Sequence, residues 1–275
     1  MNKYIINLHP IFQENALMLS QRTGIEIVND FKPKENDLVI VFGGHDKPYE
    51  LLTLQKQLNY KFGYVIIATE QLNSECYDHK HYIELLKKNI VFPFSFQISK
   101  ELKLKYEINS HSIYFFDFFT ITDTIDFKKR PIDFFFCGMK SNLRESELNK
   151  LKNKYPNANI EIDFDYSYTT PLELMKKLKD VKYVINIPFY ENSSMETHRI
   201  HRALSANCKV ISLKPCYKYE EEAYDDFVIF VNSLTDFEYD EVSRETVVKD
   251  DEWNKLMEKH GVNVINHNVE TLLKI

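Results

Sequence analysis

The sequence has little glycine, with only six glycines among 275 residues. It contains no GxGxxG fingerprint, no Walker loop and no GxSxG nucleophile motif. These motifs use glycine to bring the backbone close to a phosphate or to expose a reactive serine. Their absence removes the motif support for simple NAD-dependent dehydrogenases, P-loop NTPases and serine hydrolases.

Cysteine is also sparse, and none of the four cysteines forms a CxxC pair. Neither a zinc site nor a disulfide framework is therefore indicated, and we expect free thiols. No apolar segment reaches the ~20 residues of a membrane-spanning helix. The first residues become polar too soon for a secretory signal. These absences predict a cytoplasmic protein with no transmembrane segment.

The chain carries no excess of basic residues, and its net charge of −6 argues against a general nucleic-acid binder. Residues 217–252 alone hold 13 acidic and 3 basic residues, a net charge of −10. The remainder is therefore mildly basic, with a net charge of +4. That balance suits an anionic small ligand, and an ordinary solvated surface is the alternative.

What the sequence does contain is a regular alternation of apolar strand-like runs with helical patterns, which predicts an α/β fold with mostly parallel sheets. The expected strands are residues 3–8, 25–28, 38–42, 64–68, 90–96, 111–116, 132–137, 159–164, 183–187, 209–213 and 227–231. The expected helices are residues 11–23, 49–58, 81–88, 99–106, 145–154, 170–178, 195–206 and 251–260. A charged segment ending in Pro131 is the best linker, so we expect two domains, residues 1–127 and 128–275.

A polar loop follows the apolar run at residues 183–187. This loop carries Tyr190, Glu191, Asn192, Ser193 and Ser194, and the helix after it begins with Glu196 and Arg199. In open α/β sheets, ligands bind where loops leave the carboxyl ends of strands, over helix N-termini. The planar guanidinium of Arg199 suits a diphosphate, and the alternative is a surface ion pair with Glu196 three residues away.

A second polar loop follows the strand at residues 132–137. It contains Gly138, Lys140, Ser141 and Arg144 before the next helix. Glycine lets the backbone approach a ligand, and the loop amides with Arg144 could bind a phosphate. Both loops leave strands of the same half, so we expect them to face one cleft. An ordinary turn with an exposed arginine is the alternative.

Acid or base candidates occur in the first half, where His9, His45 and Glu70 each come just after a predicted strand. Polar surface positions or helix caps are the alternatives. Asp163 and Asp165 form a DxD pattern that could coordinate Mg²⁺ or Mn²⁺ on a nucleotide diphosphate. The histidines show no helical zinc spacing, and we predict no metal site.

Four stretches resemble the GT-B glycosyltransferases, in particular short viral and bacterial members. The run RIHRALSANCKVIS at residues 199–212 resembles their donor-site helix and strand, and the preceding Tyr190, Glu191 and Glu196 also fit. IDFFFCGMKSNLRE at residues 132–145 resembles the opening of their C-terminal domain, and YVIIATEQLNS at residues 64–74 a stretch of their N-terminal domain. The four stretches occur in the family's order.

The resemblance implies two Rossmann-like domains facing a cleft, with the acceptor mainly on the N-terminal domain and the donor mainly on the C-terminal one. The donor would be a UDP- or GDP-linked sugar used as co-substrate, without a bound metal or other cofactor. The acceptor would be a hydroxyl of a glycan or glycoconjugate. The resemblance places Gly138, Arg144 and Arg199 beside the diphosphate, and Glu191 and Glu196 at ribose or sugar hydroxyls.

The resemblance also has departures. Arg202 stands where many retaining members carry the second glutamate of a spaced pair, and Asn207 replaces the usual glycine. The retaining or inverting outcome therefore stays open. If the enzyme inverts, Glu70 or His45 would deprotonate the acceptor.

Two alternative functions remain open at this stage. One is a metal-dependent GT-A-like transferase that uses Asp163 and Asp165. The other is a catalytically inactive, GT-B-shaped binding protein, which the low glycine count would fit. If the protein is viral, we expect it in the cytoplasm of the host cell.

Overall fold

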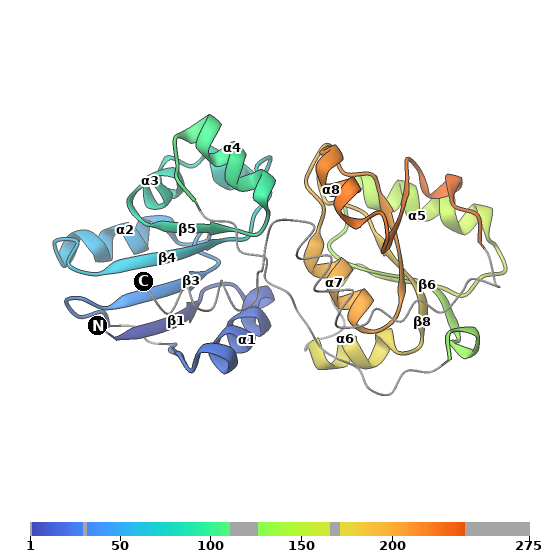
Figure 1. Cartoon of the computed structure of the whole chain (residues 1–275), viewed down its shortest axis with the longest axis horizontal. Helices are drawn as coiled ribbons and strands as arrows, with labels where there is room; N and C mark the ends of the chain where they lie inside the picture. The colour runs from blue at the N-terminus through green and yellow to red at the C-terminus, as the bar shows by residue number, and fades with distance from the viewer. Residues whose placement is uncertain (1, 30–31, 111–125, 166–170, 240–275) are drawn as a thin grey trace. The chain divides into compact units, whose positions relative to one another are not determined.

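A computed structural model describes residues 2–29, 32–110, 126–165 and 171–239 of the chain (Figure 1). These residues fall into two compact units, which we call unit 1 (residues 2–110) and unit 2 (residues 126–239). Phe127, the last residue of the predicted first domain, is buried in the core of unit 2. The predicted domain boundary between residues 127 and 128 stays a prediction.

Unit 1 contains a five-stranded parallel sheet in the order β2-β1-β3-β4-β5. Its strands are β1 (Lys3–Asn7), β2 (Glu26–Ile27), β3 (Leu38–Phe42), β4 (Gly63–Ala68) and β5 (Ile90–Pro93). Its helices are η1 (Pro10–Phe12), α1 (Gln13–Thr23), α2 (Pro48–Gln57), η2 (Glu75–Asp78), α3 (Lys80–Lys88) and α4 (Phe96–Tyr106).

Helices cover both faces of this sheet, which explains why its central strands are continuously apolar. Ile40 and Phe42 of β3 pack with Ala16 and Leu19 of α1 on one face. The alternate residues of β3 pack on the other face with α2, α3 and α4 (Figure 1). Side chains of a strand point alternately to its two faces, so one apolar run supplies both cores.

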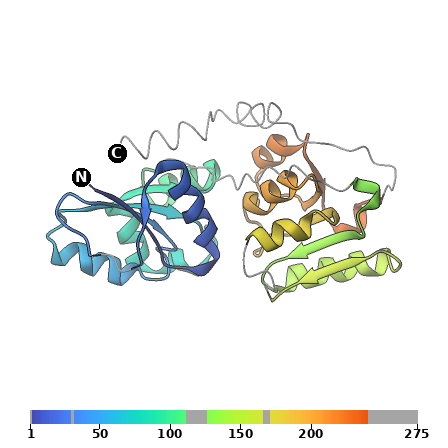
Figure 2. The same ribbon diagram turned by 90° about the horizontal axis from the view of Figure 1, so that it is seen from below.

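Unit 2 repeats this plan with a parallel sheet in the order β10-β9-β8-β6-β7. Its strands are β6 (Ile132–Cys137), β7 (Ile160–Asp163), β8 (Val181–Asn186), β9 (Lys209–Leu213) and β10 (Val228–Val231). Its helices are η3 (Phe127–Lys129), α5 (Asn142–Lys154), α6 (Pro171–Leu178), α7 (Thr197–Ser205), α8 (Lys218–Tyr224) and η4 (Leu234–Asp236). Figure 2 shows α5 on one side of the sheet and α6 and α7 on the other.

Ten of the eleven predicted strands and seven of the eight predicted helices fall on observed elements, with corrections at the helix starts. α4 begins at Phe96 rather than at residue 99, because the Ser95 hydroxyl caps it by accepting a hydrogen bond from the Ile98 amide. α7 begins at Thr197 rather than at residue 195. The strand predicted at 111–116, the helix predicted at 251–260 and the first residue of the helix predicted at 170–178 lie outside the described residues.

The strand order creates a switch point in each sheet. In unit 1 the chain leaves β1 toward β2 and then returns to the other side of β1 as β3. In unit 2 it leaves β6 toward β7 and returns as β8. Ligands of open α/β sheets bind outside the carboxyl ends of the strands at such points. The loops after β1, β3, β6 and β8 are therefore where a site is expected.

No helix among the residues that the structure describes is long and apolar enough to cross a membrane.

Candidate functional site

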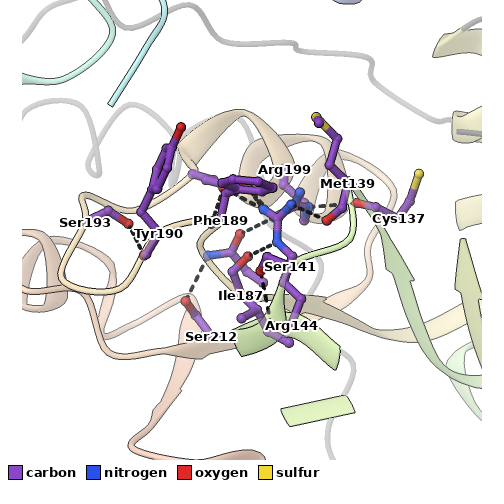
Figure 3. Close-up of polar contacts among 12 residues, drawn as sticks. Cys137, Met139, Ser141, Arg144, Ile187, Phe189, Tyr190, Ser193, Arg199 and Ser212 are labelled. Atoms are coloured by element: carbon purple, nitrogen blue, oxygen red, sulfur yellow. Dashed lines mark hydrogen bonds and ion pairs between the residues drawn. The ribbon is translucent and has the colours of Figure 1, made fainter. Parts of the chain in front are cut away.

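The switch point of unit 2 gathers three charged side chains at the carboxyl ends of β6 and β8 (Figure 3). They are Arg144 from the first turn of α5, Glu196 from the residue that precedes α7, and Arg199 from within α7. We call these three residues the Arg–Glu–Arg cluster. Two of them lie 52 residues apart in the sequence, so only the fold brings them together.

Arg144 is almost completely buried, with a side chain that is 3% exposed. Its Nε donates to the Ile187 carbonyl at 2.9 Å, and its Nη1 donates to the Met139 carbonyl at 2.8 Å. Its Nη2 donates to both oxygens of Glu196, at 2.7 and 2.9 Å. Arg144 thus ties the loop after β6 to the loop after β8.

Glu196 uses all of its acceptor capacity within the protein. A carboxylate offers about four acceptor positions on its two oxygens. Oε1 accepts from Arg144 Nη2 and, at 3.0 Å, from the Phe189 amide. Oε2 accepts from Arg144 Nη2 and, at 2.5 Å, from Arg199 Nη1. Glu196 therefore holds the two arginines and has no acceptor position left for a sugar hydroxyl.

The two arginines also fix the charge of Glu196. Burial alone would raise the pKa of this carboxyl group, but the positive charges of Arg199 and Arg144 outweigh it and hold the pKa below the ordinary value. The Arg–Glu–Arg cluster consequently carries one net positive charge at neutral pH.

Arg199 is the member of the cluster with donors to spare. Its Nε donates to the Cys137 carbonyl at 3.2 Å, and its Nη1 donates to Asn186 Oδ1 at 3.1 Å and to Glu196. Its Nη2 makes no hydrogen bond to any described residue and lies beside Gly138. The side chain is 12% exposed. Two N–H groups of a fixed guanidinium are thus available beside the loop after β6.

Gly138 makes room for this guanidinium. A Cβ at this position would lie 2.7 Å from Arg199 Nη2 and 3.3 Å from Arg144 Nη1. The first of these distances is closer than non-bonded atoms approach, so a side chain here would displace Arg199. The sequence analysis expected Gly138 to let the backbone approach a ligand, which stays a prediction; in the structure the group that lies against Gly138 is Arg199.

Hydrogen bonds from Arg199 to Asn186 and from Asn186 to Ser212 hold the Arg199 guanidinium in place. Neither Asn186 nor Ser212 was among the predicted site residues. Asn186 ends β8 and donates from Nδ2 to the Ser212 hydroxyl at 2.9 Å, while its Oδ1 accepts from Arg199. The Ser212 hydroxyl donates in turn to the Leu213 carbonyl. Both side chains are fully buried. A polar residue within an otherwise apolar strand is the signal that could have found them.

The other predicted residues of these two loops lie around the cluster with different roles. Ser141 caps α5 by accepting from the Arg144 amide, and Lys140 forms an exposed ion pair of 2.7 Å with Glu145. The Ser193 hydroxyl donates to the Tyr190 carbonyl, which closes the loop after β8. In the same loop Asn192 has a left-handed backbone (φ +53°), Glu191 is exposed and Ser194 is buried.

Glu220 of α8 holds the end of the loop after β8 in place. It was not among the predicted site residues either. Its Oε2 accepts from the Met195 amide at 2.9 Å, next to Glu196, and its buried Oε1 has no hydrogen-bond partner. Burial raises the pKa of Glu220 to about 7, although hydrogen bonds from Met195 and Ser194 oppose the shift. Sequence gave no signal, because Glu220 is one of three consecutive glutamates.

The switch point of unit 1 brings the loops after β1 and β3 into contact. Gly43 has a left-handed backbone (φ +70°), and a Cβ there would lie 2.7 Å from the His9 Cβ and 2.9 Å from the His9 nitrogen. Glycine adopts such a backbone readily, and the contact with His9 leaves no room for a side chain at this position. The rings of His9 and His45 consequently lie 6.1 Å apart, centroid to centroid.

Two of the three residues predicted as acid or base candidates, His45 and Glu70, lie together at this edge. Glu70 Oε1 is 3.5 Å from His45 Nε2, and Asp46 Oδ1 is 3.4 Å from the same nitrogen. The Glu70 side chain is 27% exposed and that of His45 is 13% exposed. Glu70 is therefore the more accessible member of the pair. The acid and base roles themselves stay predictions.

Of the predicted alternative metal ligands, Asp163 is the last residue of β7 and Asp165 follows it. Asp163 Oδ1 accepts from the Asp165 amide at 3.0 Å, and the Cys137 thiol points to Asp163 Oδ2 at 3.7 Å. Within the described ranges, no group of three or more His, Cys, Asp or Glu side chains is arranged to hold a metal ion.

Comparison with known proteins gives a likeness in structure only. No family model and no curated protein matches the sequence. TarM from S. aureus, solved as a variant with fondaparinux, α-GlcNAc-glycerol and UDP, matches 88% of this chain with a TM-score of 0.58 and 16% identity. An α-glucosyltransferase (AGT) in complex with UDP matches 94% of this chain with a TM-score of 0.54 and 9% identity.

The matched shares of the two known structures differ. The chain spans 56% of the TarM chain, which is about half its length, and 90% of the AGT chain. Both are glycosyltransferases of the GT-B type. This chain has the α/β architecture with two Rossmann-like units that defines the GT-B glycosyltransferase fold.

Proposed function

We propose that the protein is a glycosyltransferase that moves a sugar from a nucleotide diphosphate sugar to an acceptor hydroxyl of a glycan or glycoconjugate. The observation that carries this proposal is the uncommitted Nη2 of Arg199, held beside Gly138 at the switch point of unit 2. Arg144 donates hydrogen bonds to both oxygens of Glu196 and to the carbonyl groups of Met139 and Ile187 in the two loops. Arg199 is then the group that contacts an anion.

A diphosphate fits this site better than a carboxylate or a neutral ligand. The cluster has a net positive charge, its donors are fixed before the ligand arrives, and it stands next to the N-terminus of α7. Helix N-termini and guanidinium groups both favour phosphate oxygens. TarM and AGT, whose fold this chain shares, were both solved with UDP, which supports a nucleotide donor.

The reaction places the negative charge where Arg199 can stabilise it. The acceptor oxygen forms a bond to the anomeric carbon of the donor, and the bond from that carbon to the diphosphate oxygen breaks. The bonding electrons leave with the diphosphate. The Nη2 donors of Arg199 stabilise the negative charge that develops on its oxygen atoms. Preorganised donors of this kind need no rearrangement during the reaction, which is why they lower its barrier.

If the reaction inverts the configuration at the anomeric carbon, a base must remove the proton of the acceptor hydroxyl. We assign this role to Glu70, because it is the more exposed partner of the Glu70–His45 pair. His45 is then a positioning residue that orients the carboxylate and stabilises its charge. A carboxylate within reach of a histidine is a suitable general base.

Thermal unfolding of the full chain with a panel of UDP- and GDP-sugars tests the proposal. A ligand that binds only the folded state raises apparent stability, by about 2.7 kcal/mol when present at 100 times its dissociation constant. At least one nucleotide sugar should raise the midpoint, and the same donor should release nucleotide when mixed with glycan acceptors.

Two results would count against this proposal. If no nucleotide sugar raises the midpoint, the donor site is wrongly assigned. If a nucleotide sugar binds but is never turned over, the chain is the inactive GT-B-shaped binding protein. Turnover that is lost on adding EDTA and in Asp163→Ala would instead favour the metal-dependent alternative.

A further inference from the structure

His198 lies in the first turn of α7, directly before Arg199 and two residues after Glu196. Unlike these two neighbours it is exposed, and it forms no hydrogen bond or ion pair with any residue that the structure describes. Both nitrogens of its ring are therefore available at the edge of the Arg–Glu–Arg cluster.

The geometry of α7 places His198 on the side of the helix that faces the anion site. Residues four apart share one face of a helix, so His198 lies on the same face as Arg202. Burial raises the pKa of the Cys137 thiol, and the positive charges of Arg199 and Arg202 oppose this shift, so both arginines lie near Cys137. Cys137 ends β6 directly before Gly138. His198 thus stands at the N-terminal end of the face that looks onto the loop after β6, where a helix favours anions.

The surroundings of His198 keep its ring neutral at neutral pH. Removal of water by the surrounding protein lowers the pKa of this ring from 6.5 to about 4, and the negative charge of Glu196 opposes the shift. Arg199 and Arg202 of α7 and Arg144 of α5 add positive charges that also lower the pKa. Since the residue is exposed, its loss of water is incomplete, and the three arginines are the firmer cause of the shift.

A diphosphate bound at Arg199 reverses this balance of charge. The three arginines and Glu196 together carry two net positive charges, and a nucleotide-linked diphosphate carries one negative charge on each phosphate. The ligand therefore cancels the field that lowers the pKa of His198, and the pKa returns to about 6.5, the ordinary value for histidine. A protonated imidazole has two N–H donors, and its charge strengthens their hydrogen bonds to phosphate oxygens.

We propose that His198 contacts the diphosphate of the donor beside Arg199, and that it takes up a proton from solvent when the donor binds. The proton returns to solvent when the nucleotide leaves. Donor binding is then stronger in mild acid than at pH 8. This inference rests on the proposed function, because it takes a nucleotide diphosphate sugar as the ligand.

Isothermal titration of the full chain at pH 5.5 and pH 8 tests this inference, with UDP-glucose, UDP-N-acetylglucosamine and GDP-mannose as probes. The phosphates of these nucleotide sugars are diesters that do not titrate in this range, so the charge of the ligand stays constant. With a His198 pKa of about 4 in the free protein and about 6.5 in the complex, wild type should bind about tenfold more tightly at pH 5.5. Titrations at pH 5.5 in two buffers of different ionisation enthalpy should show the uptake of about one proton.

Two variants of His198 distinguish a titrating contact from a structural role. His198→Gln keeps a hydrogen-bond donor but cannot take up a proton, so its affinities at the two pH values should agree within about twofold. His198→Lys carries a permanent charge, so it should bind at pH 8 about as tightly as wild type binds at pH 5.5. His79→Gln removes an exposed histidine of unit 1 and should keep the pH dependence of wild type. Glu220, whose pKa burial raises to about 7, is present in all four proteins, so its titration cancels in the comparison.

The results separate this inference from the proposed function. If a nucleotide sugar binds and His198→Gln keeps the pH dependence of wild type, the role of His198 is wrong and the donor site stands. A His198→Lys protein that binds no more tightly than wild type at pH 8 would also show that His198 does not contact the diphosphate. If none of the three nucleotide sugars binds at either pH, the proposed function is wrong, and so is the role of His198.

Discussion

Replacing Glu196 by glutamine tests the Arg–Glu–Arg cluster, because it keeps the shape of the side chain and removes its charge. The glutamine has one acceptor oxygen in place of two, and its NH₂ group would face an arginine. About half of the four hydrogen bonds that Glu196 accepts would be lost. The positive charge of Arg144, which is 3% exposed, would remain buried without a counter-charge.

The expected cost follows from this burial. Removing one partner of a buried ion pair typically costs 3–5 kcal/mol. Arg144 keeps its two carbonyl acceptors and Arg199 keeps Asn186, so we expect the lower end, about 3 kcal/mol. For a domain of this size that loss lowers the unfolding midpoint by roughly 10 °C. Scanning calorimetry measures it, and a transition that belongs to unit 1 should stay where it is.

Glu145→Gln is the matched control, since it makes the same substitution in an exposed ion pair with Lys140. Exposed pairs contribute about 0–1 kcal/mol, so its midpoint should move by only about 2 °C. The pKa of Glu196 is held below its ordinary value of 4.5, so its contribution is present above pH 4.5 and is lost as the pH falls through the lower, folded-state value. Wild type and Glu196→Gln should therefore converge in acid. Equal midpoint shifts for Glu196→Gln and Glu145→Gln at neutral pH would refute the reasoning.

Three further substitutions test separate parts of the structure. Gly138→Ala should displace Arg199 Nη2, since the new Cβ would lie 2.7 Å away. The fold should be kept, and the affinity for nucleotide should fall about tenfold because one charge-assisted hydrogen bond is lost. Titration calorimetry measures this affinity. Gly43→Ala should destabilise unit 1 by roughly 2 kcal/mol or more, because the φ angle of Gly43 is +70° and His9 leaves no room for a side chain. Urea unfolding measures this loss of stability. Glu220→Gln should abolish a pH dependence of the free energy of unfolding. The pKa of Glu220 in the folded state, about 7, lies above the ordinary 4.5, so the wild type loses about 3 kcal/mol of stability as the pH rises from 4.5 to 7. The variant has no carboxyl group at this position and should not show this loss. Unfolding midpoints of both proteins across this pH range measure the difference.

Each of these expectations has a contrary result. Unchanged nucleotide affinity in Gly138→Ala would show that Arg199 needs no clearance there. A Gly43→Ala protein as stable as wild type would mean that the loop can move away from His9. Parallel pH curves for wild type and Glu220→Gln would show that Glu220 is not the titrating group.

Much of the fold could be predicted from sequence, because buried parallel strands are continuous apolar runs. The run at residues 38–42 is buried on both faces and coincides with β3. Helix starts were less certain, because a cap depends on which of several serines meets a free amide. Ser95 and Ser99 are equivalent by type, and only the backbone geometry selects Ser95.

The meeting of the two polar loops of unit 2 could also be predicted, while the contacts of their charged residues could not. The polar loops after β6 and β8 were identified from residue types alone. Whether an arginine faces a ligand or is buried against a carboxylate depends on contacts between distant segments. Arg144 is such a case, because its carboxylate partner lies 52 residues away. Asn186 and Ser212 were missed because the candidate residues were sought in the loops, and both of these residues belong to strands.

The first unit gives the converse example. His45 and Glu70 were selected only because each follows a predicted strand, and the structure brings them to 3.5 Å. Parallel strands end at one edge, so polar residues just past neighbouring strands tend to meet. The contact between Tyr49 and His81 could not be foreseen, because it depends on the packing of two helices.

The central claim is that Arg199 supplies the free donors for a nucleotide diphosphate. Isothermal titration of UDP and GDP into wild type, Arg199→Gln and the control Arg202→Gln measures it most directly. The control removes the same charge one turn further along α7. We predict that wild type binds one of the two nucleotides, that Arg199→Gln binds it roughly 30-fold more weakly, for a loss of about 2 kcal/mol, and that Arg202→Gln stays near wild type. Equal affinities for wild type and Arg199→Gln, or no binding of either nucleotide by wild type, would contradict the account.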